Sequence, residues 1–465
     1  MTLATISVAS RLAEITGASN VTSDPAQLVA YGIDGKVPAA AVKPGSRDEI
    51  SEIVKFAAAE HLAIVPCGAR SKLAMGAPPS RYDVALDVTR LDHIVAYDPS
   101  DLTLSVEPGI PLQRLAGVLA GHRQFLPLAV PFLSRATAGG TVAAGVHSPL
   151  RQAYGTARDF LLGVEFVTGE GVQAKSGGLV VKNVAGYDLH KLTIGSLGTL
   201  GIITKINFRT FPAPASTRVF AASSDSADGV LDMRRRIAQS PLRPLTANML
   251  SPGSVEMLAS GPAARIEPGP TPVDGLPKSQ WAFLATFAGA GAVLVRYESE
   301  LRRIADEAGC GSCTIYGDDE KPASFGRLRE FVPIALESSP ATTIIKLSVV
   351  RSKLKDILEG IEHAARANEL RWAAMADGLG VIYAALLPSA RDEQARVRVA
   401  KASERINGAC AQLGGNVTIP FCPSEWKSTL KIWGPERGDF EQIRKLKKVF
   451  DPADVLAPGR FAGGI

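Results

Sequence analysis

The spacing of apolar residues between positions 40 and 72 predicts a strand, a helix and a second strand. A short apolar run at Ala41 and Val42 precedes Ser46, which forms with Glu49 the S-x-x-E pattern that caps a helix start. The helix is marked by apolar residues at helical spacing, Ile50, Ile53, Val54 and Ala57. The next strand, at 62–65, ends in the loop PCGARSK at 66–72. A loop at the carboxyl end of such a strand is the usual place for a ligand in an α/β sheet.

Alternating apolar and polar positions predict further strands up to residue 209. The expected elements are strands at 84–86, 94–97 and 102–106, a helix at 112–119, and a hairpin of 161–167 with 172–174. After Gly201, alternate residues of the last strand are expected to share one face, Ile202, Thr204, Ile206 and Phe208.

A linker, PAPAST at 212–217, leads into a second half with a different pattern of predicted elements. There, strand-like runs at 282–287, 344–349 and 380–387 alternate with amphipathic helices at 297–308, 354–367 and 392–410, which predicts a second α+β domain. A final helix is expected at 440–449. In EWKSTLKIWG, residues 425–434, the alternation predicts a strand with Lys427 and Lys431 on one face, and solvated cations are favoured there over a substrate contact.

Composition excludes several classes of protein. Hydrophobic residues make up 46% of the 465 and charged residues 21%, an ordinary globular balance. A net charge of +5 without a Lys/Arg block disfavours nucleic acid as a partner. No secretory signal or membrane span is expected, and five cysteines, an odd and sparse count, fit a reducing cytoplasm. The single C-x-x-C pair, Cys310 and Cys313, cannot alone complete a zinc or iron–sulfur site.

Glycine clusters in the first half point to a large ligand. The loop at 66–72, the run ATAGGTVAAG at 136–145 and the stretch around Gly195, Gly198 and Gly201 can each bring backbone close to a bound molecule. Rossmann and P-loop patterns are absent from the sequence, so a nucleotide site of either type is disfavoured. Three such segments suit a ligand with a diphosphate and ring systems. For Gly195 a helix C-cap explains the residue equally well. For Gly201 proximity to the ligand is favoured, and a valine there is expected to suit the strand itself.

These segments resemble the vanillyl-alcohol-oxidase or PCMH-type FAD flavoproteins. PCGARSK is similar to the family's P-x-G-G-G-[ST] diphosphate loop, and ATAGGTVAAG to its second FAD loop. RQAYGTARDFLLGVEFVTGEG, GGLVVKNVAGYDLHKLTIGSLGTLGIIT and LKKVFDPADVLAPGRF match three longer family motifs in order and spacing. The resemblance covers about 38–214 and the last thirty residues. Within the family it is closest to the FAD-binding (E) subunit of bacterial glycolate oxidase.

The resemblance implies an α+β fold divided into four parts. They are an N-terminal helical segment at 1–37, a two-subdomain PCMH-type FAD-binding domain at 38–214, a cap or substrate domain at 215–425, and a C-terminal segment at 426–465 that packs back on the FAD domain. The cofactor-binding residues carried over are Pro66, Cys67, Gly68, Ala69, Arg70, Ser71, Lys72, Pro127, Thr137, Gly139, Gly140, Thr141, Ala143, Ala144, Gly145, Ser148, Gly155, Gly198, Gly201, Ile202 and Arg460.

Departures from the family pattern qualify what is expected. Ala69 and Arg70 replace two glycines of the first loop, and Arg70 can either pair with a phosphate or crowd the loop. The first loop has no histidine, and Cys67 is at the wrong position for covalent attachment, so noncovalent FAD is expected. His147 is expected either near the flavin ring or as a structural histidine. The cap holds a single histidine, His363, and no G-E-H-G-x-G run, so no metal site is expected.

The function implied is that of an FAD-binding subunit of a glycolate oxidase-like 2-hydroxy-acid dehydrogenase. Its partners would be a homologous catalytic flavoprotein subunit and an iron–sulfur subunit, which would receive the electrons that the flavin takes from the hydroxy acid. Two alternatives stay open: a free-standing FAD-dependent dehydrogenase of D-lactate or a related acid, and a non-catalytic interaction subunit. The catalytic residues and the oligomeric state are not indicated by the sequence.

Overall fold

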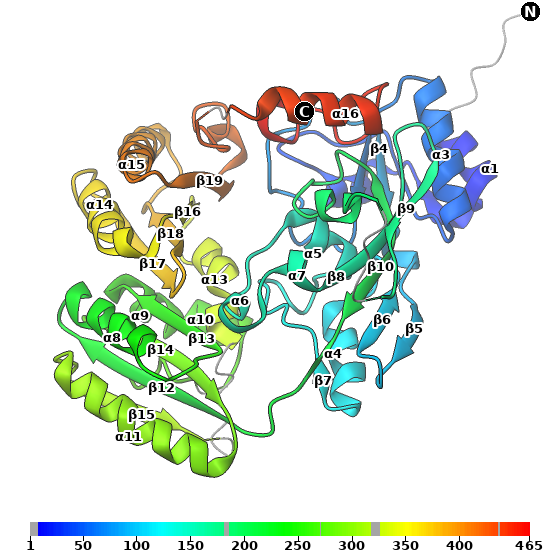
Figure 1. The fold of residues 1–465 in the computed structure, drawn as a ribbon. Coiled ribbons are helices and arrows are strands. Elements are labelled where there is room, and N and C mark those ends of the chain that lie inside the picture. Colours follow the sequence, from blue (N-terminus) through cyan, green and yellow to red (C-terminus); the bar gives the residue numbers. More distant parts are fainter. Residues whose placement is uncertain (1–7, 181–185, 270, 318–325, 436–437) are drawn as a thin grey trace, which may run out of the picture.

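The computed structural model describes residues 8–180, 186–269, 271–317, 326–435 and 438–465. Figure 1 shows two halves side by side, with the C-terminal helix α16 (Phe440–Phe450) lying over the first half. Part of the motif GGLVVKNVAGYDLHKL, residues 181–185, lies outside the described residues. Of the helices described, none combines the length and apolar character that a membrane span needs.

A small four-stranded sheet opens the first half. Its order is β1 (Val21–Thr22), β2 (Ala40–Val42), β4 (Val84–Asp87) and β3 (Ile64–Cys67), with β2 and β3 parallel to β4. Helices α1 (Val8–Thr16) and α3 (Arg47–Ala59) pack on it, because Leu12 and the apolar stripe of α3 share one core with the strands. The predicted strand–helix–strand unit is confirmed, with β4 between its two strands. The N-terminal segment expected to be helical also contains β1 and the short helix α2 (Pro25–Leu28).

A second sheet of five antiparallel strands follows. Its order is β5 (Ile94–Asp98), β6 (Thr103–Val106), β10 (Ile202–Arg209), β8 (Leu161–Val167) and β9 (Gln173–Gly177), and the predicted β8–β9 hairpin is confirmed. Four helices and a two-stranded ribbon accompany it: α4 (Leu112–Gly121), α5 (Ala138–Ala144), α6 (Arg151–Tyr154), α7 (Ala157–Phe160), and β7 (Gln124–Phe125) paired with β11 (Phe211–Pro212).

The predicted alternation along β10 is wrong at its start. The pairing of β10 with β8 shifts between Ile203 and Lys205, so that Thr204 is an extra residue, a β-bulge. As a result Ile203, and not Ile202, shares a core with Ile206 and Phe208. Ile202 packs instead in the core of the four-stranded sheet. The bulge therefore lets one strand serve two cores.

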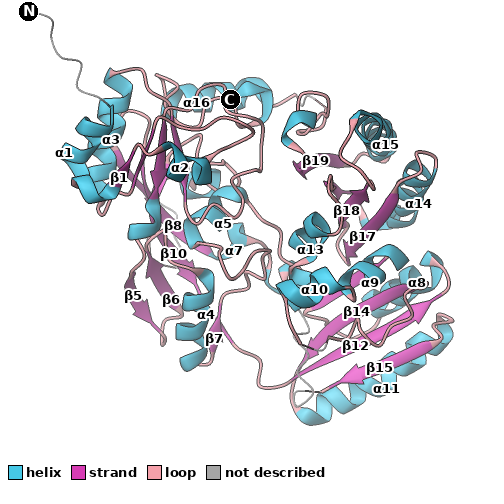
Figure 2. Ribbon diagram, turned by 180° about the vertical axis from the view of Figure 1, so that it is seen from behind, coloured by secondary structure: helices cyan, strands magenta, loops and turns pink. Residues whose placement is uncertain are grey.

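An eight-stranded antiparallel sheet forms the second half. Its order is β15 (Ser312–Tyr316), β12 (Thr217–Ser224), β14 (Trp281–Ala288), β13 (Thr246–Leu250), β17 (Arg371–Asp377), β18 (Val381–Leu387), β16 (Thr343–Ser348) and β19 (Asn416–Phe421). One face is covered by α8 (Ala227–Gln239), α11 (Gly291–Glu307), α14 (Leu354–Arg366) and α15 (Glu393–Gln412). The other carries α9 (Pro252–Leu258), α10 (Gly261–Ile266), α12 (Gly326–Arg329) and α13 (Phe331–Glu337). Figure 2 shows these helices on both sides of the strands.

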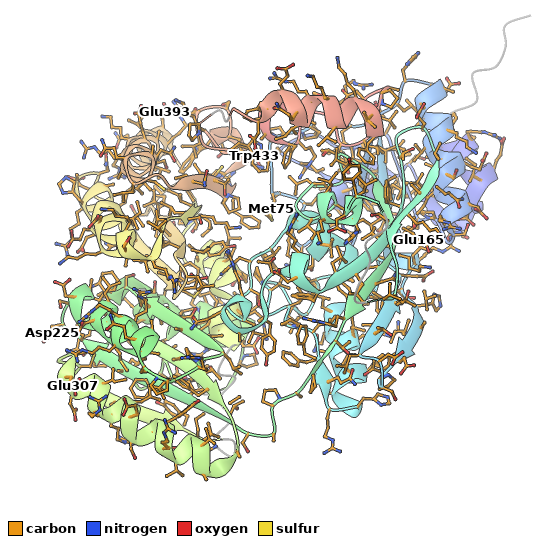
Figure 3. The ribbon with its side chains drawn as sticks, viewed as in Figure 1. Met75, Glu165, Asp225, Glu307, Glu393 and Trp433 are labelled. Atoms are coloured by element: carbon orange, nitrogen blue, oxygen red, sulfur yellow. The ribbon has the colours of Figure 1, made fainter. Side chains whose placement is uncertain are left out.

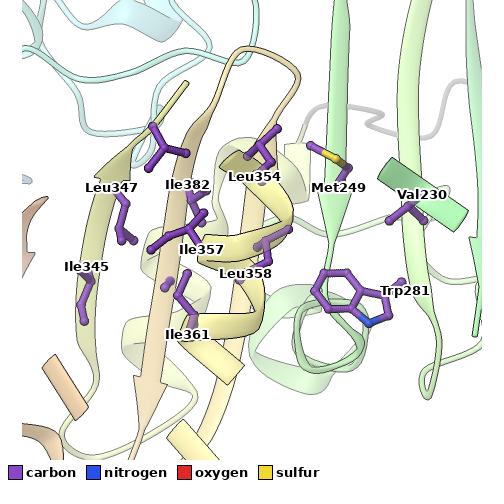
Figure 4. Packing of buried hydrophobic residues seen from close by; sticks show 14 of the residues in the cluster. Val230, Met249, Trp281, Ile345, Leu347, Leu354, Ile357, Leu358, Ile361 and Ile382 are labelled. Atoms are coloured by element: carbon purple, nitrogen blue, oxygen red, sulfur yellow. The ribbon is translucent and has the colours of Figure 1, made fainter. Parts of the chain in front are cut away.

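The core under α14 illustrates how this half is held. Leu354, Ile357, Leu358 and Ile361 recur at helical spacing and are at most 1% exposed. Figure 4 shows them against strand residues of the same cluster, among them Ile345 and Ile382. Burying each such side chain contributes about 1.5–3 kcal/mol to folding, so α14 is fixed firmly on this face of the sheet.

The prediction that residues 425–434 form a strand is wrong. The segment contains a 3₁₀ helix, Ser424–Trp426, followed by turns. Lys427 is buried and its Nζ donates to Asp34 Oδ2 at 2.8 Å and to the carbonyls of Ala74 and Gly76, whereas Lys431 is exposed. The ion pair reaches across 393 positions, so local alternation could not reveal it.

Candidate flavin groove and adjoining chamber

Three segments far apart in the sequence meet in a groove of the first half. The loop after β3, the start of α5 and the entry into β10 supply nearly all of its lining. Of the predicted residues, those that line it are Pro66, Cys67, Gly68, Ala69, Arg70, Ser71, Lys72, Thr137, Gly139, Gly140, Ala143, Ala144, Gly198, Gly201, Ile202 and Arg460. Apolar residues that the sequence did not single out complete it: Val65, Leu73, Val88, Pro108, Leu197 and Ile203.

Glycines allow these segments to approach one another. A Cβ on Gly68 would lie 2.3 Å from Thr137 Oγ1, the hydroxyl that caps α5. A Cβ on Gly198, whose φ is +78°, would lie 2.4 Å from Pro66 Cγ. Both distances are far below van der Waals contact, so each glycine joins two walls of the groove. The glycines thus allow the segments that line the groove to pack directly against one another.

The expectation that valine suits position 201 is wrong. A Cβ on Gly201 would lie 2.7 Å from Cδ2 of Phe166, a side chain only 3% exposed. Gly201 also lines the groove. The glycine is thus required by packing within the protein, whatever the groove holds.

Five predicted cofactor residues do not line the groove. Thr141 lies buried within α5, and Gly145 lines a neighbouring chamber. Ser148 Oγ accepts from the backbone N–H of Ala129 and Leu150, which makes it a turn residue. Gly155, at φ +78°, joins α6 to α7, where a Cβ would lie 2.5 Å from Asp159 Oδ2. Pro127 is buried outside the lining.

Arg460 gives the groove an unpaired cationic donor. Its Nη2 donates to the carbonyls of Leu73 and Met75, which fixes the loop that follows the first glycine segment. Its Nη1 is buried and has no hydrogen-bond partner within the part of the chain that is described. Burial lowers the pKa of Arg460 to about 10, so it stays charged at neutral pH. A buried N–H on a cation is stabilised by a negatively charged oxygen acceptor, and the diphosphate of FAD can provide one.

Arg70 is held by protein groups. Its φ of +61° matches the glycine that the family motif has at this position. Its Nη1 lies 3.0 Å from Oδ2 of the buried Asp87. The guanidinium also stacks on the Tyr31 ring, with Cζ 4.5 Å from the ring centre. Tyr31 donates its hydroxyl to the same Asp87 oxygen, and burial followed by this carboxylate raises the pKa of Tyr31. Arg70 therefore neutralises Asp87 at the edge of the groove.

Lys72 marks the junction between the groove and a second cavity. It lines both and is 9% exposed. Its Nζ donates to Ser71 Oγ at 3.3 Å and lies 5.8 Å from the centre of the Phe132 ring. Among the described residues no carboxylate lies within ion-pairing distance. Burial lowers its pKa to about 8, an effect that the charge of Glu330 partly opposes. Near neutral pH the lysine is thus a cation that is ready to lose its proton.

The second cavity, here called the chamber, lies between the two halves and measures about 160 Å³. The register of the large sheet places Tyr383, Lys346 and Thr418 side by side across β18, β16 and β19, and all three line the chamber. Met75 and Trp433 line it as well, and Figure 3 labels both where the two halves meet. A single lysine within the apolar strand TIIKLS is the sequence signal that could have pointed to this site.

Lys346 is the second cation of the chamber. The described residues offer it no hydrogen-bond or ion-pair partner, and burial followed by the charge of Arg151 lowers its pKa. Burial likewise raises the pKa of Tyr383, whose hydroxyl therefore stays protonated. Among the described residues, the lining of the chamber thus presents cationic and neutral donors and no carboxylate.

His147 is engaged behind the chamber. Its Nε2 lies 3.0 Å from Asp377 Oδ2, both side chains are 7% exposed, and its ring centre is 6.2 Å from that of Tyr383. Burial lowers the pKa of His147, while Asp377 opposes the change. Asp377 also accepts from the backbone N–H of Leu379 and Val381. Of the two roles expected for His147, the structure shows the one in which a protein partner holds the ring.

Metal and thiol chemistry find little support. In the described ranges no three His, Cys, Asp or Glu side chains are grouped so as to hold a metal ion. All five cysteines are free. Cys67 is buried, and burial raises the pKa of its thiol, so it behaves as a small packing residue.

Comparison with known proteins agrees with this geometry. A family model for the FAD binding domain matches residues 38–177, and one for the C-terminal domain of FAD linked oxidases matches residues 213–419. Glycolate oxidase subunit GlcD of Bacillus subtilis is 25% identical over 98% of this chain and 96% of its own. Glycolate oxidase subunit GlcE of Escherichia coli is 39% identical over 36% of this chain and 47% of its own.

A solved structure extends the likeness to the fold. The structure of p-cresol methylhydroxylase with substrate bound matches with a TM-score of 0.78 over 97% of this chain and 96% of its own, at 17% identity. The two family models confirm the FAD flavoprotein family that was expected from the glycine segments. The chain belongs to the PCMH-type FAD flavoproteins and is an FAD-dependent oxidoreductase related to glycolate oxidase.

Proposed function

We propose that this chain oxidises a small 2-hydroxy acid and does so as a flavoprotein subunit of a glycolate oxidase-like complex. The observation that carries the proposal is the junction at Lys72, where the flavin groove meets a chamber whose described lining has two lysines and no carboxylate. A 2-hydroxy acid is an anion with a neighbouring hydroxyl, so it needs a cation for the carboxylate and a polar group at the carbon to be oxidised.

The chamber's size and charge favour a small acid. At about 160 Å³ it lies below the roughly 300–1,000 Å³ of sites for larger organic ligands. Lys346, on the sheet side, is suited to hold the carboxylate, and Tyr383 beside it can donate a hydrogen bond. The neutral amine of Lys72, which a pKa of about 8 makes accessible near neutral pH, can accept the proton that the substrate hydroxyl loses. FAD, when bound, supplies the acceptor for the hydride equivalent from the substrate carbon.

The cofactor is proposed to be held without a covalent bond. The part of the groove lining that the structure describes has no histidine, and the thiol of Cys67 is buried with a raised pKa. Residues 38–214 would hold FAD, 215–425 would cap it, and 426–465 would close the groove through Arg460. A homologous flavoprotein subunit and an iron–sulfur subunit are proposed as partners. Similarity to both a GlcD and a GlcE subunit supports a multi-subunit arrangement.

A free-standing dehydrogenase is the second candidate. It is favoured by the chamber, which this chain completes from its own two halves, and by similarity to GlcD along nearly the whole length. The two candidates differ in whether the isolated chain turns over, and a single experiment separates them.

The experiment uses the purified full chain. Acid precipitation should release FAD into the supernatant, and anaerobic glycolate or D-lactate should bleach the flavin absorbance. Lys346→Met should weaken the substrate's effect about tenfold or more, whereas Lys353→Met, an exposed lysine paired with Asp356, should not. Bleaching with slow dye reduction that partner subunits accelerate supports the complex, and fast turnover alone supports the free-standing enzyme. A colourless chain that cannot take up FAD would refute both in favour of an interaction subunit.

A further inference from the structure

A cavity of about 460 Å³ lies away from the groove and the chamber, where α6 of the first half meets the second half. It is lined by Gln152 and Ala153 of α6, by α8, β13 and β14, and by the turn between β17 and β18. Three arginines, Arg234, Arg243 and Arg351, line it, and no aspartate or glutamate in the described ranges does. Cavities between domains are common places for small ligands.

The arginines of this cavity are uncompensated, in contrast with their neighbours. On α8, Arg235 and Arg236 both pair with Asp232. Arg234, the preceding residue, instead donates from Nη1 to the carbonyl of Gly378 at 3.2 Å. Its Nε is buried and has no partner among the described residues.

The other two cations are equally unpaired. Within the described part of the chain, Arg243 donates only to backbone carbonyls, those of Ser240 and Leu242. The described residues provide Arg351 with no hydrogen-bond or ion-pair partner. Burial, followed by the nearby charge of Arg351, lowers the pKa of Arg234. Like charges gathered without a counter-charge oppose folding, so an anion that bridges them would relieve the repulsion.

A fourth group indicates what the anion carries. Gln152 Oε1 is buried and accepts no hydrogen bond from any described residue. It lies so close to Gly378 that a Cβ there would be 2.7 Å away, so glycine at 378 makes room for this amide. An acceptor that lines the same cavity as three arginines suits an oxyanion that also has an O–H, as hydrogen phosphate does. Planar guanidinium groups bind such tetrahedral oxyanions with paired N–H donors.

We propose that this arginine-lined cavity is a binding site for a phosphate group, either free phosphate or a small phosphate monoester, distinct from the flavin site. The tetrahedral oxygens would be shared by Arg234, Arg243 and Arg351. The O–H of hydrogen phosphate, or of a monoester bound as its monoanion, would donate to Gln152 Oε1. The concave shape and the two buried unpaired atoms favour a small molecule over an acidic segment of a partner protein.

The test is calorimetric titration of the FAD-saturated full chain, so that the flavin groove cannot take up the probe. Inorganic phosphate and ethyl phosphate are the probes, and succinate, a dianion without an O–H at neutral pH, is the comparison. One site with a dissociation constant of about 1 mM or tighter is expected for at least one phosphate, with succinate weaker. If inorganic phosphate alone binds the site takes the free ion, and tighter binding of ethyl phosphate assigns it to monoesters.

Variants connect the binding to this cavity. Arg234→Gln and Arg351→Gln should each weaken phosphate about tenfold or more, and Arg235→Gln, the exposed neighbour on α8, should leave it unchanged. Arg351 is exposed and unpaired, so its substitution leaves the fold intact and decides the matter even where Arg234→Gln unfolds. Phosphate should also protect Arg243 and Arg351 from phenylglyoxal, read by peptide mass spectrometry.

Three titration results would each overturn the proposal. They are no phosphate binding up to about 20 mM, equal binding by wild type and Arg351→Gln, and an equal loss in Arg235→Gln, which would report net charge only. Protection of the arginines by a partner subunit and not by phosphate would also overturn it, and would identify a protein-docking surface.

Discussion

Replacing Lys72 with methionine should stabilise the protein without FAD and weaken FAD binding at the same time. Methionine has a similar volume and no charge, so the packing against Phe132 is retained. The difference between the ordinary lysine pKa of 10.5 and about 8 in the folded protein corresponds to about 3 kcal/mol. This is the free energy by which burial of the cation opposes folding, and Lys72→Met should recover most of it at pH 7.

The pH dependence gives the prediction its sign. Below pH 8 both the folded and the unfolded lysine bind a proton, so the unfavourable burial is fully present. Between pH 8 and 10.5 the unfolded chain keeps the proton and the folded protein releases it, so wild-type stability rises with pH relative to the variant. The advantage of Lys72→Met should therefore fall by about 2 kcal/mol between pH 7.5 and 9.5.

The assay is urea unfolding of both apo-proteins across this pH range, together with FAD titration at pH 7. FAD is an anion, so loss of a buried cation in its groove should weaken binding about tenfold or more. A variant that is less stable than wild type at pH 7, or a stability difference that does not change with pH, would refute the reasoning. Unchanged FAD affinity would show that Lys72 serves the chamber alone.

The remaining predictions concern buried groups with different partners. Lys427→Met should destabilise the protein by about 3–5 kcal/mol in urea unfolding, because it leaves Asp34 buried and unpaired; a loss below about 1 kcal/mol would contradict the buried pair. Gly201→Val should lower the melting temperature of the apo-protein, with an overpacking penalty of about 1–3 kcal/mol against Phe166, and a normal melt would contradict that clash. Cys67 in the folded chain should resist maleimide at pH 7, measured by mass spectrometry, and should react after unfolding.

Most of the elements and much of the groove follow from local sequence. The helical spacing in 50–57 and the glycine loops are signals that involve residues close together in the sequence. The order of the glycine segments along the chain was enough to identify the family. The row of Tyr383, Lys346 and Thr418 could not be predicted, because it depends on the register of three strands spread over nearly eighty residues.

The errors also have a common physical cause. The apparent alternation around Lys427 was overridden by its ion pair with Asp34, at the other end of the chain. The bulge at Thr204 moved Ile203 to a different core, and no local pattern marks it. Tertiary contacts decided each case.

The tethers on the loop that follows β3 have a consequence for how the protein is made. Lys427 and Arg460 hold the carbonyls of residues 73–76, yet they lie 353 and 387 positions later than the groups they bind. At about 5–20 residues per second, a ribosome needs about 20–80 s to pass from Leu73 to Arg460. During that time the whole eight-stranded sheet emerges, while the loop still lacks its hydrogen bonds from Lys427 and Arg460. Cofactor loading is therefore expected to follow translation, and a stalled nascent chain would carry a folded cap beside an open flavin groove.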